Sequence, residues 1–212
     1  MNLAKFIDHT ILKPQATVDD ITRLCSEAAE NKFAAVCINP IYVDLSAHLL
    51  KGTGVKVATV IGFPLGSTLT AVKVLETREA VIRRADELDM VINIGAAKMG
   101  CWDAVIEDIK QVVDAADGKL VKVIIEAALL TDDEKRRACQ AVIDGGAHFV
   151  KTSTGFGPGG ATIEDVKLFK TVVGSTIKIK AAGGIRNRQD AEAMIAAGAA
   201  RIGTSAGVEI VR

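Results

Sequence analysis

Short, nearly continuous apolar runs alternate with amphipathic segments along the whole chain. The runs predict eight strands, at 4–8, 34–38, 56–61, 88–93, 120–126, 148–152, 176–182 and 200–205. Apolar runs with little polar alternation are typical of parallel strands buried on both faces. The segments between them are rich in Ala, Glu, Lys and Leu and predict helices, most clearly over 17–32, 68–85, 131–147, 161–174 and 187–199.

This alternation of strands and helices predicts an α/β fold, a single-domain (β/α)8 TIM barrel. The predicted strands start roughly 22 to 32 residues apart, which suits βαβ units and an all-parallel sheet. An open doubly wound sheet is the competing architecture, but no Gly-rich dinucleotide-binding turn follows an early strand. No linker, low-complexity stretch or charge run divides the sequence, so we expect residues 1–212 to form one domain with a short C-terminus.

Composition narrows the class of protein. Lys plus Arg and Asp plus Glu are 26 each, and this balance argues against a nucleic-acid partner held by a general positive charge. No apolar run approaches the roughly 20 residues that span a membrane, and the first residues lack the zones of a signal peptide. The cysteines have no metal-binding spacing, so we expect reduced thiols, no metal and a cytoplasmic location. They are Cys25, Cys37, Cys101 and Cys139.

Two lysines inside apolar strands carry the strongest chemical signal. Lys151 and Lys180 fall on adjacent strands of the predicted barrel, roughly 5 Å apart in the pairing direction. Desolvation and a neighbouring ammonium both disfavour the charged amine, so one lysine can act as a Schiff-base nucleophile and the other as its activating cation. A structural ion pair with Asp89, Glu126 or Asp8 is supported about equally well by the strand pattern alone.

Glycine-rich loops follow the last predicted strands. Gly183 and Gly184 come directly after the seventh strand, and the segment 203–207 (GTSAG) follows the eighth. Phosphate sites of barrels often use these two loops, because glycine lets the backbone approach the anion closely. Two tight turns are the structural alternative, but the paired placement favours a phosphate. The loop 151–162 (KTSTGFGPGGAT) can close over a phosphorylated ligand or form a flexible turn.

These motifs resemble those of the bacterial and archaeal 2-deoxyribose-5-phosphate aldolases. The resemblance covers nearly the whole chain, through IDHTILKP, VCINP, VIGFPLG, ELDMVINIGA, VKVIIEAALL, FVKTSTGFGPGGAT, IKAAGGIR and RIGTSAG. It implies a (β/α)8 barrel and a class I, Schiff-base aldolase that uses no metal or cofactor. It also implies the reaction, a reversible cleavage of 2-deoxy-D-ribose 5-phosphate to D-glyceraldehyde 3-phosphate and acetaldehyde, in deoxynucleoside catabolism.

The resemblance also implies the role of individual residues. Lys151 is the expected Schiff-base nucleophile, Lys180 its activating proton donor and acceptor, and Asp89 the proton relay. Supporting positions around the pocket and the phosphate contacts complete the expected site: Asp8, Cys37 and Lys122 for the pocket, and Thr154, Gly155, Gly183, Gly184 and Ser205 for the phosphate. For Cys37, a small buried hydrophobic role is the alternative.

The residues leave two competing functions open. Another phosphate-binding barrel enzyme and a non-enzymatic sugar-phosphate-binding module are the competing functions, although a binding module has no use for both Lys151 and Lys180. Exposed apolar helix faces indicate a homodimer or homotetramer.

Some relatives carry a C-terminal tail with a tyrosine that assists proton transfer. Because the sequence ends at GVEIVR, we expect Asp89 and an ordered water to move protons instead.

Overall fold

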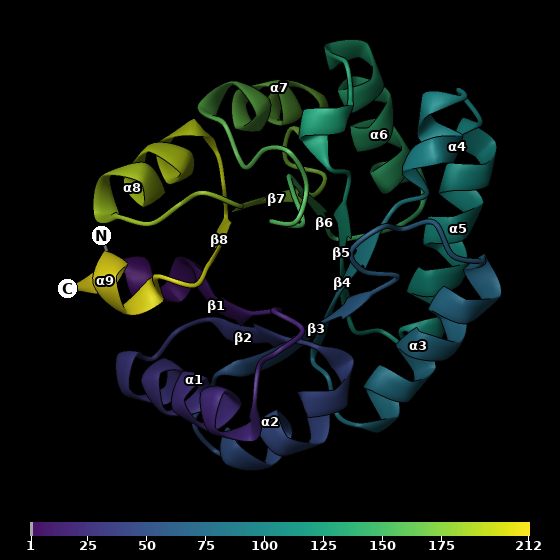
Figure 1. The fold of residues 1–212 in the computed structure, drawn as a ribbon. Coiled ribbons are helices and arrows are strands. Elements are labelled where there is room, and N and C mark those ends of the chain that lie inside the picture. Colours follow the sequence, from purple (N-terminus) through teal and green to yellow (C-terminus); the bar gives the residue numbers. More distant parts are fainter. Residues whose placement is uncertain (1) are drawn as a thin grey trace.

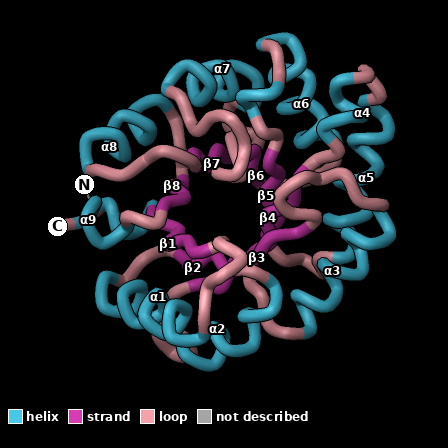
Figure 2. Tube along the Cα trace, in the orientation of Figure 1, coloured by secondary structure: helices cyan, strands magenta, loops and turns pink. Residues whose placement is uncertain are grey.

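In the computed structural model, which describes residues 2–212, eight parallel strands close into a barrel. Each strand pairs with its neighbours in sequence, and β1 also pairs with β8 to close the sheet. Figure 2 shows the strands as an inner ring with the helices around it. The predicted (β/α)8 barrel is therefore confirmed. The strands are β1 (Ile7–Ile11), β2 (Ala35–Ile38), β3 (Lys56–Ile61), β4 (Glu87–Val91), β5 (Leu120–Ile124), β6 (Phe149–Lys151), β7 (Lys178–Ala182) and β8 (Arg201–Thr204).

The outer layer contains the five helices that the sequence pattern predicts most clearly, and four others. The predicted ones are α1 (Val18–Asn31), α3 (Thr70–Ile82), α6 (Asp132–Asp144), α7 (Ile163–Val173) and α8 (Arg188–Ala197). The others are α2 (Val43–Leu49), α4 (Ile94–Lys98), α5 (Trp102–Ala115) and α9 (Gly207–Val211). Thr17 and Thr131 start α1 and α6 with complete capping boxes, which satisfy backbone N–H groups that the helix leaves unpaired. Figure 1 shows α9 and the N-terminal segment side by side, so both ends of the chain lie at the β1–β8 seam.

The prediction of the first strand at 4–8 is wrong in its position. Leu3–Phe6 form a 3-10 helix, η1, because the Asn2 side chain accepts a hydrogen bond from the Ala4 N–H and starts a helical turn. Leu3 and Ala4 are buried in the core. β1 therefore begins at Ile7, and Asp8 becomes the second residue of the strand rather than its end.

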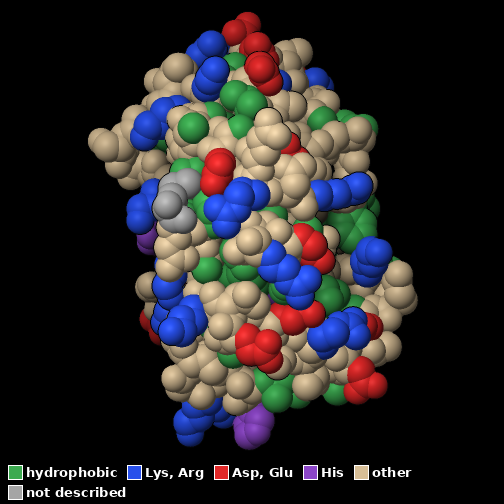
Figure 3. Space-filling view, turned by 90° about the vertical axis from the view of Figure 1, so that its left-hand side faces the viewer, with side chains coloured by type: hydrophobic (Ala, Val, Ile, Leu, Met, Phe, Trp, Pro, Cys, Tyr) green, Lys and Arg blue, Asp and Glu red, His purple; other side chains and the backbone are tan. Residues whose placement is uncertain are grey.

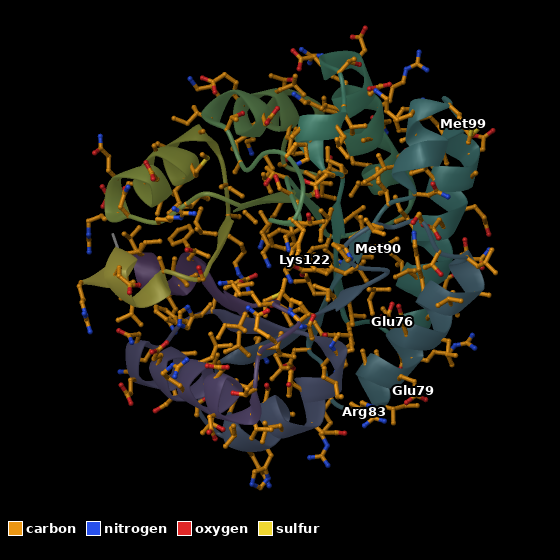
Figure 4. The ribbon with its side chains drawn as sticks, in the orientation of Figure 1. Glu76, Glu79, Arg83, Met90, Met99 and Lys122 are labelled. Carbon is orange, nitrogen blue, oxygen red and sulfur yellow. The ribbon has the colours of Figure 1, made fainter. Side chains whose placement is uncertain are left out.

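Side chains of each strand alternate between the barrel interior and the helix layer. On β4, Leu88 and Met90 pack in the main hydrophobic core, whereas Asp89 lies among charged side chains. Figure 4 shows Lys122 of β5 within the ring of strands. The interior has a charged half and an apolar half, and the apolar half is a small cluster that is separate from the main hydrophobic core. That cluster consists of Leu12, Ala35, Cys37, Ala58 and Val60, with Phe63 packed against it.

The molecular surface mixes charges of both signs where it can be seen. Figure 3, which views the side that carries α8 and α9 in Figure 1, shows acidic and basic side chains interspersed rather than gathered by sign. Within residues 2–212, no helix is long and apolar enough to cross a membrane.

A buried ion pair fixes α3 against α5. Lys73 is fully buried, and its Nζ donates to Asp108 Oδ2 at 2.5 Å and to the Val91 carbonyl at 2.9 Å. The Thr70 hydroxyl donates to the second oxygen of Asp108 at 2.8 Å. These bonds connect the start of α3 to both its neighbouring helix and the end of β4.

Replacing Lys73 with methionine (Lys73→Met) leaves Asp108 buried without its ammonium partner. We expect the free energy of unfolding, measured by urea denaturation, to fall by about 3–5 kcal/mol. The matched variant Arg83→Met breaks an exposed pair with Asp44 at the end of the same helix and should cost less than about 1 kcal/mol. Equal losses in the two variants would contradict the structural role of the buried pair.

Candidate active site

The centre of the barrel holds one carboxylate shared by three lysines. Asp89 is fully buried, and its Oδ1 accepts a hydrogen bond from Lys122 Nζ at 2.7 Å. Its Oδ2 accepts from Lys151 Nζ at 2.8 Å and from Lys180 Nζ at 2.7 Å. The structure therefore brings together the predicted nucleophile, activating lysine and proton relay, with Lys122 beside them.

The positions of Lys151 and Lys180 follow directly from strand register. The two residues are register partners on β6 and β7, as the predicted adjacency requires. A single oxygen of Asp89 lies between their ammonium groups. The ion pairs that the strand pattern allowed thus form with Asp89 and, for Lys180, with Asp8, whereas Glu126 pairs with neither lysine.

Asp8 continues the network on the other side of Lys180. Its Oδ2 lies 2.5 Å from Lys180 Nζ, and its Oδ1 accepts from Arg201 Nε at 2.6 Å. The later start of the first strand, at Ile7, matters here, because at the second position of β1 the Asp8 carboxylate faces the interior. Asp8 is fully buried.

The ionisation of these groups follows from competition between burial and charge. Burial alone would raise the pKa of the Asp89 carboxyl, but Lys122, Lys151 and Lys180 hold that pKa well below its usual range. Asp8 behaves in the same way, because Lys180 and Arg201 outweigh burial and lower its pKa. Burial alone would lower the pKa of Lys180, yet Asp8 and Asp89 raise it above its ordinary value. Asp8, Asp89 and Lys180 are therefore charged at neutral pH.

Cys37 lies between the apolar and the charged parts of the interior. It is fully buried in the apolar half of the interior, and its Sγ lies 4.0 Å from Asp89 Oδ2. Burial raises the pKa of its thiol, so Cys37 stays a neutral thiol beside the charged network.

The predicted phosphate glycines lie at the carboxyl end of the barrel. Gly155, Gly183 and Gly184 all have positive φ, of 84°, 91° and 83° respectively. A Cβ on Gly160 would collide with the Gly183 backbone, so the β6–α7 and β7–α8 loops touch each other there. Ser205 is exposed at the end of the neighbouring β8. The glycine loops and Ser205 thus gather where barrel enzymes bind their substrates.

Thr154, a predicted phosphate contact, is bound to Glu126. Its N–H donates to Glu126 Oε2 at 3.2 Å, and its hydroxyl donates to the same oxygen. Both polar groups therefore hold the β6–α7 loop against Glu126. Burial of the Glu126 carboxyl against residue 157 also explains the glycine there, because a Cβ on Gly157 would lie 2.8 Å from the Glu126 carboxyl carbon.

Sequence reasoning missed Glu87 and Arg201 as members of the charged network. Glu87 Oε2 lies 2.7 Å from Lys122 Nζ, and Arg201 Nη2 donates to the same oxygen at 3.0 Å. Arg201 pairs in register with Lys180, so a charged residue at a strand position was the signal that could have identified it. Among residues 2–212, no group of three or more His, Cys, Asp or Glu side chains is placed to hold a metal ion.

Acid should destabilise the protein through Asp8 and Asp89. A carboxyl whose pKa is lower in the folded state adds stability above its unfolded value, about 3.9, and loses it as the pH falls through the folded value. Urea titrations should therefore give a free energy of unfolding that falls below about pH 4. The variant Asp8→Asn should lose less stability between about pH 7 and 3 than the wild type does. Asp133→Asn, at an exposed carboxyl of α6, is the control, and a full acid loss in Asp8→Asn would exclude the linkage.

Known proteins match this chain along nearly its whole length, in sequence and in fold. The DeoC/LacD aldolase family matches residues 2–212. A deoxyribose-phosphate aldolase of Staphylococcus epidermidis is 58% identical over the whole chain and 96% of its own length, and one from a Geobacillus species is 59% identical over 99% of the chain and 95% of its own. A solved structure of the tetrameric deoxyribose phosphate aldolase from Aeropyrum pernix has a TM-score of 0.93 at 35% identity, covering 99% of this chain and 89% of that one. The chain belongs to the DeoC/LacD family of aldolases.

Proposed function

We propose that this chain is a class I aldolase that reversibly cleaves 2-deoxy-D-ribose 5-phosphate to D-glyceraldehyde 3-phosphate and acetaldehyde. The observation that carries the proposal is the pair Lys151 and Lys180 bound to one oxygen of a buried carboxylate. Such an arrangement offers an amine nucleophile and an adjacent ammonium acid within one hydrogen-bonded unit. The relatives at 58% and 59% identity carry the name of this activity.

In the proposed reaction, Lys151 forms the covalent bond to the substrate. Its neutral amine adds to the aldehyde carbon C1, and the resulting carbinolamine loses water to give an iminium. The charged Lys180 is placed to protonate the departing hydroxyl, since it shares Asp89 Oδ2 with Lys151. The iminium then serves as the electron sink for the next step.

Cleavage moves one proton and one electron pair. A base takes the proton of the C3 hydroxyl, the C2–C3 bond breaks, and its electron pair flows into the iminium to give an enamine. D-Glyceraldehyde 3-phosphate leaves, the enamine carbon gains a proton, and water hydrolyses the new iminium to release acetaldehyde and free Lys151. We assign both proton transfers at carbon and oxygen to a water positioned by Asp89, a contribution of about 10²–10⁴-fold in rate.

The two ends of the substrate match the two kinds of surface around the lysines. The phosphate fits the backbone N–H groups of Gly155, Gly183 and Gly184, with Ser205 beside them. The reacting two-carbon unit fits the apolar half of the interior, where Cys37 lies beside Asp89 and Phe63 packs against the same apolar cluster. Holding both ends fixes C1 over Lys151 and so favours attack.

Trapping the covalent intermediate tests this function. Sodium borohydride with acetaldehyde should leave one ethyl group on Lys151, identified by peptide mass spectrometry. The variant Lys151→Leu should lose cleavage of 2-deoxyribose 5-phosphate and the adduct while its circular dichroism stays that of the wild type. Lys178→Leu, which removes an exposed lysine from the other end of β7, is the matched control. An adduct on Lys180, or none, would overturn the assignment.

We also propose that the chain works in the cytoplasm as a homodimer or homotetramer. Free thiols at all four cysteines suit a reducing compartment. For assembly, the support is an exposed apolar face on α3 and the residue before it, formed by Leu69, Val72, Leu75 and Ile82, with exposed fractions of 47% to 74%. These positions fall on one side of the helix, and the Aeropyrum pernix relative is a tetramer.

Charge placed on this face should break the assembly. We expect Leu75→Glu to lower the molar mass measured by multi-angle light scattering to that of one chain, because burying a carboxylate between copies is unfavourable. Met99→Glu, at another exposed apolar residue directly after α4, should leave the mass unchanged. An oligomer that survives Leu75→Glu would place the interface elsewhere, and a wild-type monomer would refute the assembly.

A further inference from the structure

The charged groups of the barrel interior form a closed ring in which positive and negative members alternate. Going round it, each member lies within hydrogen-bonding distance of the next: Lys180, Asp8, Arg201, Glu87, Lys122, Asp89 and back to Lys180. The separations are 2.5, 2.6, 3.0, 2.7, 2.7 and 2.7 Å. Three cations therefore face three carboxylates, and the ring has no net charge.

Lys151 stands outside this ring and touches it at one point. Its Nζ contacts the Asp89 carboxylate at 2.8 Å, whereas each cation of the ring contacts two carboxylates. Arg201 even binds Glu87 with two nitrogens, at 3.2 and 3.0 Å. The three carboxylates are already balanced by the three cations of the ring. A proton on Lys151 thus adds a positive charge for which the ring has no further carboxylate.

The remaining titratable groups on and beside the surrounding strands form no ion pair with the cluster. Cys37 of β2 is a neutral thiol, and His9 of β1 points away from the interior and bonds Glu27 of α1. Lys56 and Lys178 are exposed at the first residues of β3 and β7, where water screens them. Glu126, after β5, is bound to Thr154 rather than to a lysine.

We propose that Arg201 and Glu87 are positioning residues that complete this neutral ring. Lys151 is then the lysine of the cluster that can lose its proton without leaving a carboxylate of the ring unbalanced. Arg201 supplies the third cation, which Asp8 and Glu87 need if Lys151 is to be uncharged. Without Arg201 the ring would carry one excess negative charge, and a protonated Lys151 would fill the deficit. The inference rests on the proposed function, because it gives a reason why Lys151 rather than Lys180 is the nucleophile.

The pH dependence of Schiff-base trapping tests the proposal in the full-length protein. The readout is the rate at which acetaldehyde and cyanoborohydride modify Lys151, whose midpoint in pH reports loss of the proton. Arg201→Met should move this midpoint upward by about one pH unit, and Glu87→Gln should move it downward by about the same amount. At a fixed pH on the acid side, each shift is about tenfold in trapping rate.

Two matched variants separate charge from structure. Arg201→Met/Glu87→Gln removes one charge of each sign and should return the midpoint to within a few tenths of a unit of the wild type. Arg201→Lys keeps the charge and should also keep the wild-type midpoint. A purely structural role would lower the rate or the stability of the variants without moving the midpoint in opposite directions.

The outcomes distinguish this inference from the proposed function. A wild type that gives no Lys151 adduct at any pH refutes the function itself. A wild type that is trapped on Lys151, with an unmoved midpoint in Glu87→Gln, refutes only the role of the ring. If Arg201→Met does not fold, the nearly isosteric Glu87→Gln decides alone. Its trapping midpoint must shift downward, because the ring of this variant carries one excess positive charge.

Discussion

Everything in the barrel interior depends on the Asp89 carboxylate. An ammonium group buried without a partner costs several kcal/mol, and this barrel encloses three lysines around that single side chain. Asp89 lies on β4, between the apolar half and the charged half of the interior, and both of its carboxylate oxygens accept hydrogen bonds from lysines. Because the three lysines come from β5, β6 and β7, one carboxylate also fixes the relative heights of three strands.

The interior of the barrel is polar on one side of Asp89 and apolar on the other. Charged groups cover the side formed by β1 and β4 to β8, and small apolar side chains cover β2 and β3. Low local polarity on one side strengthens the electrostatic interactions on the other. Lys151 therefore lies on the charged side of Asp89, and Cys37 lies on its apolar side.

Most of the architecture could be predicted from the sequence, since continuous apolar runs at regular intervals allow few folds other than a parallel barrel. The same pattern placed Lys151 beside Lys180, because strand order alone determines that adjacency. Local turns were less accessible: nothing in the apolar pattern distinguishes a 3-10 turn at Leu3–Phe6 from a strand. Glu87 and Arg201 were missed because they look like solvent-facing strand ends until closure of the barrel brings the Arg201 side chain against both Asp8 and Glu87. The engagement of Thr154 by Glu126 depends on the left-handed backbone of Glu126, with φ of 50°, for which no sequence signal exists.

The contact between Asp8 and Arg201 has a consequence for how the chain folds. These residues are 193 positions apart, and they join the first strand to the last. A partial barrel without β8 would enclose Asp8 and Glu87 while their guanidinium partner is still absent. Such an intermediate lacks the hydrogen bonds by which Arg201 joins Asp8 to Glu87, so seven strands gain less from closing early. The interior electrostatics therefore favour docking of the final strand as a cooperative event, with the β1–β8 seam as the last part of the sheet to form.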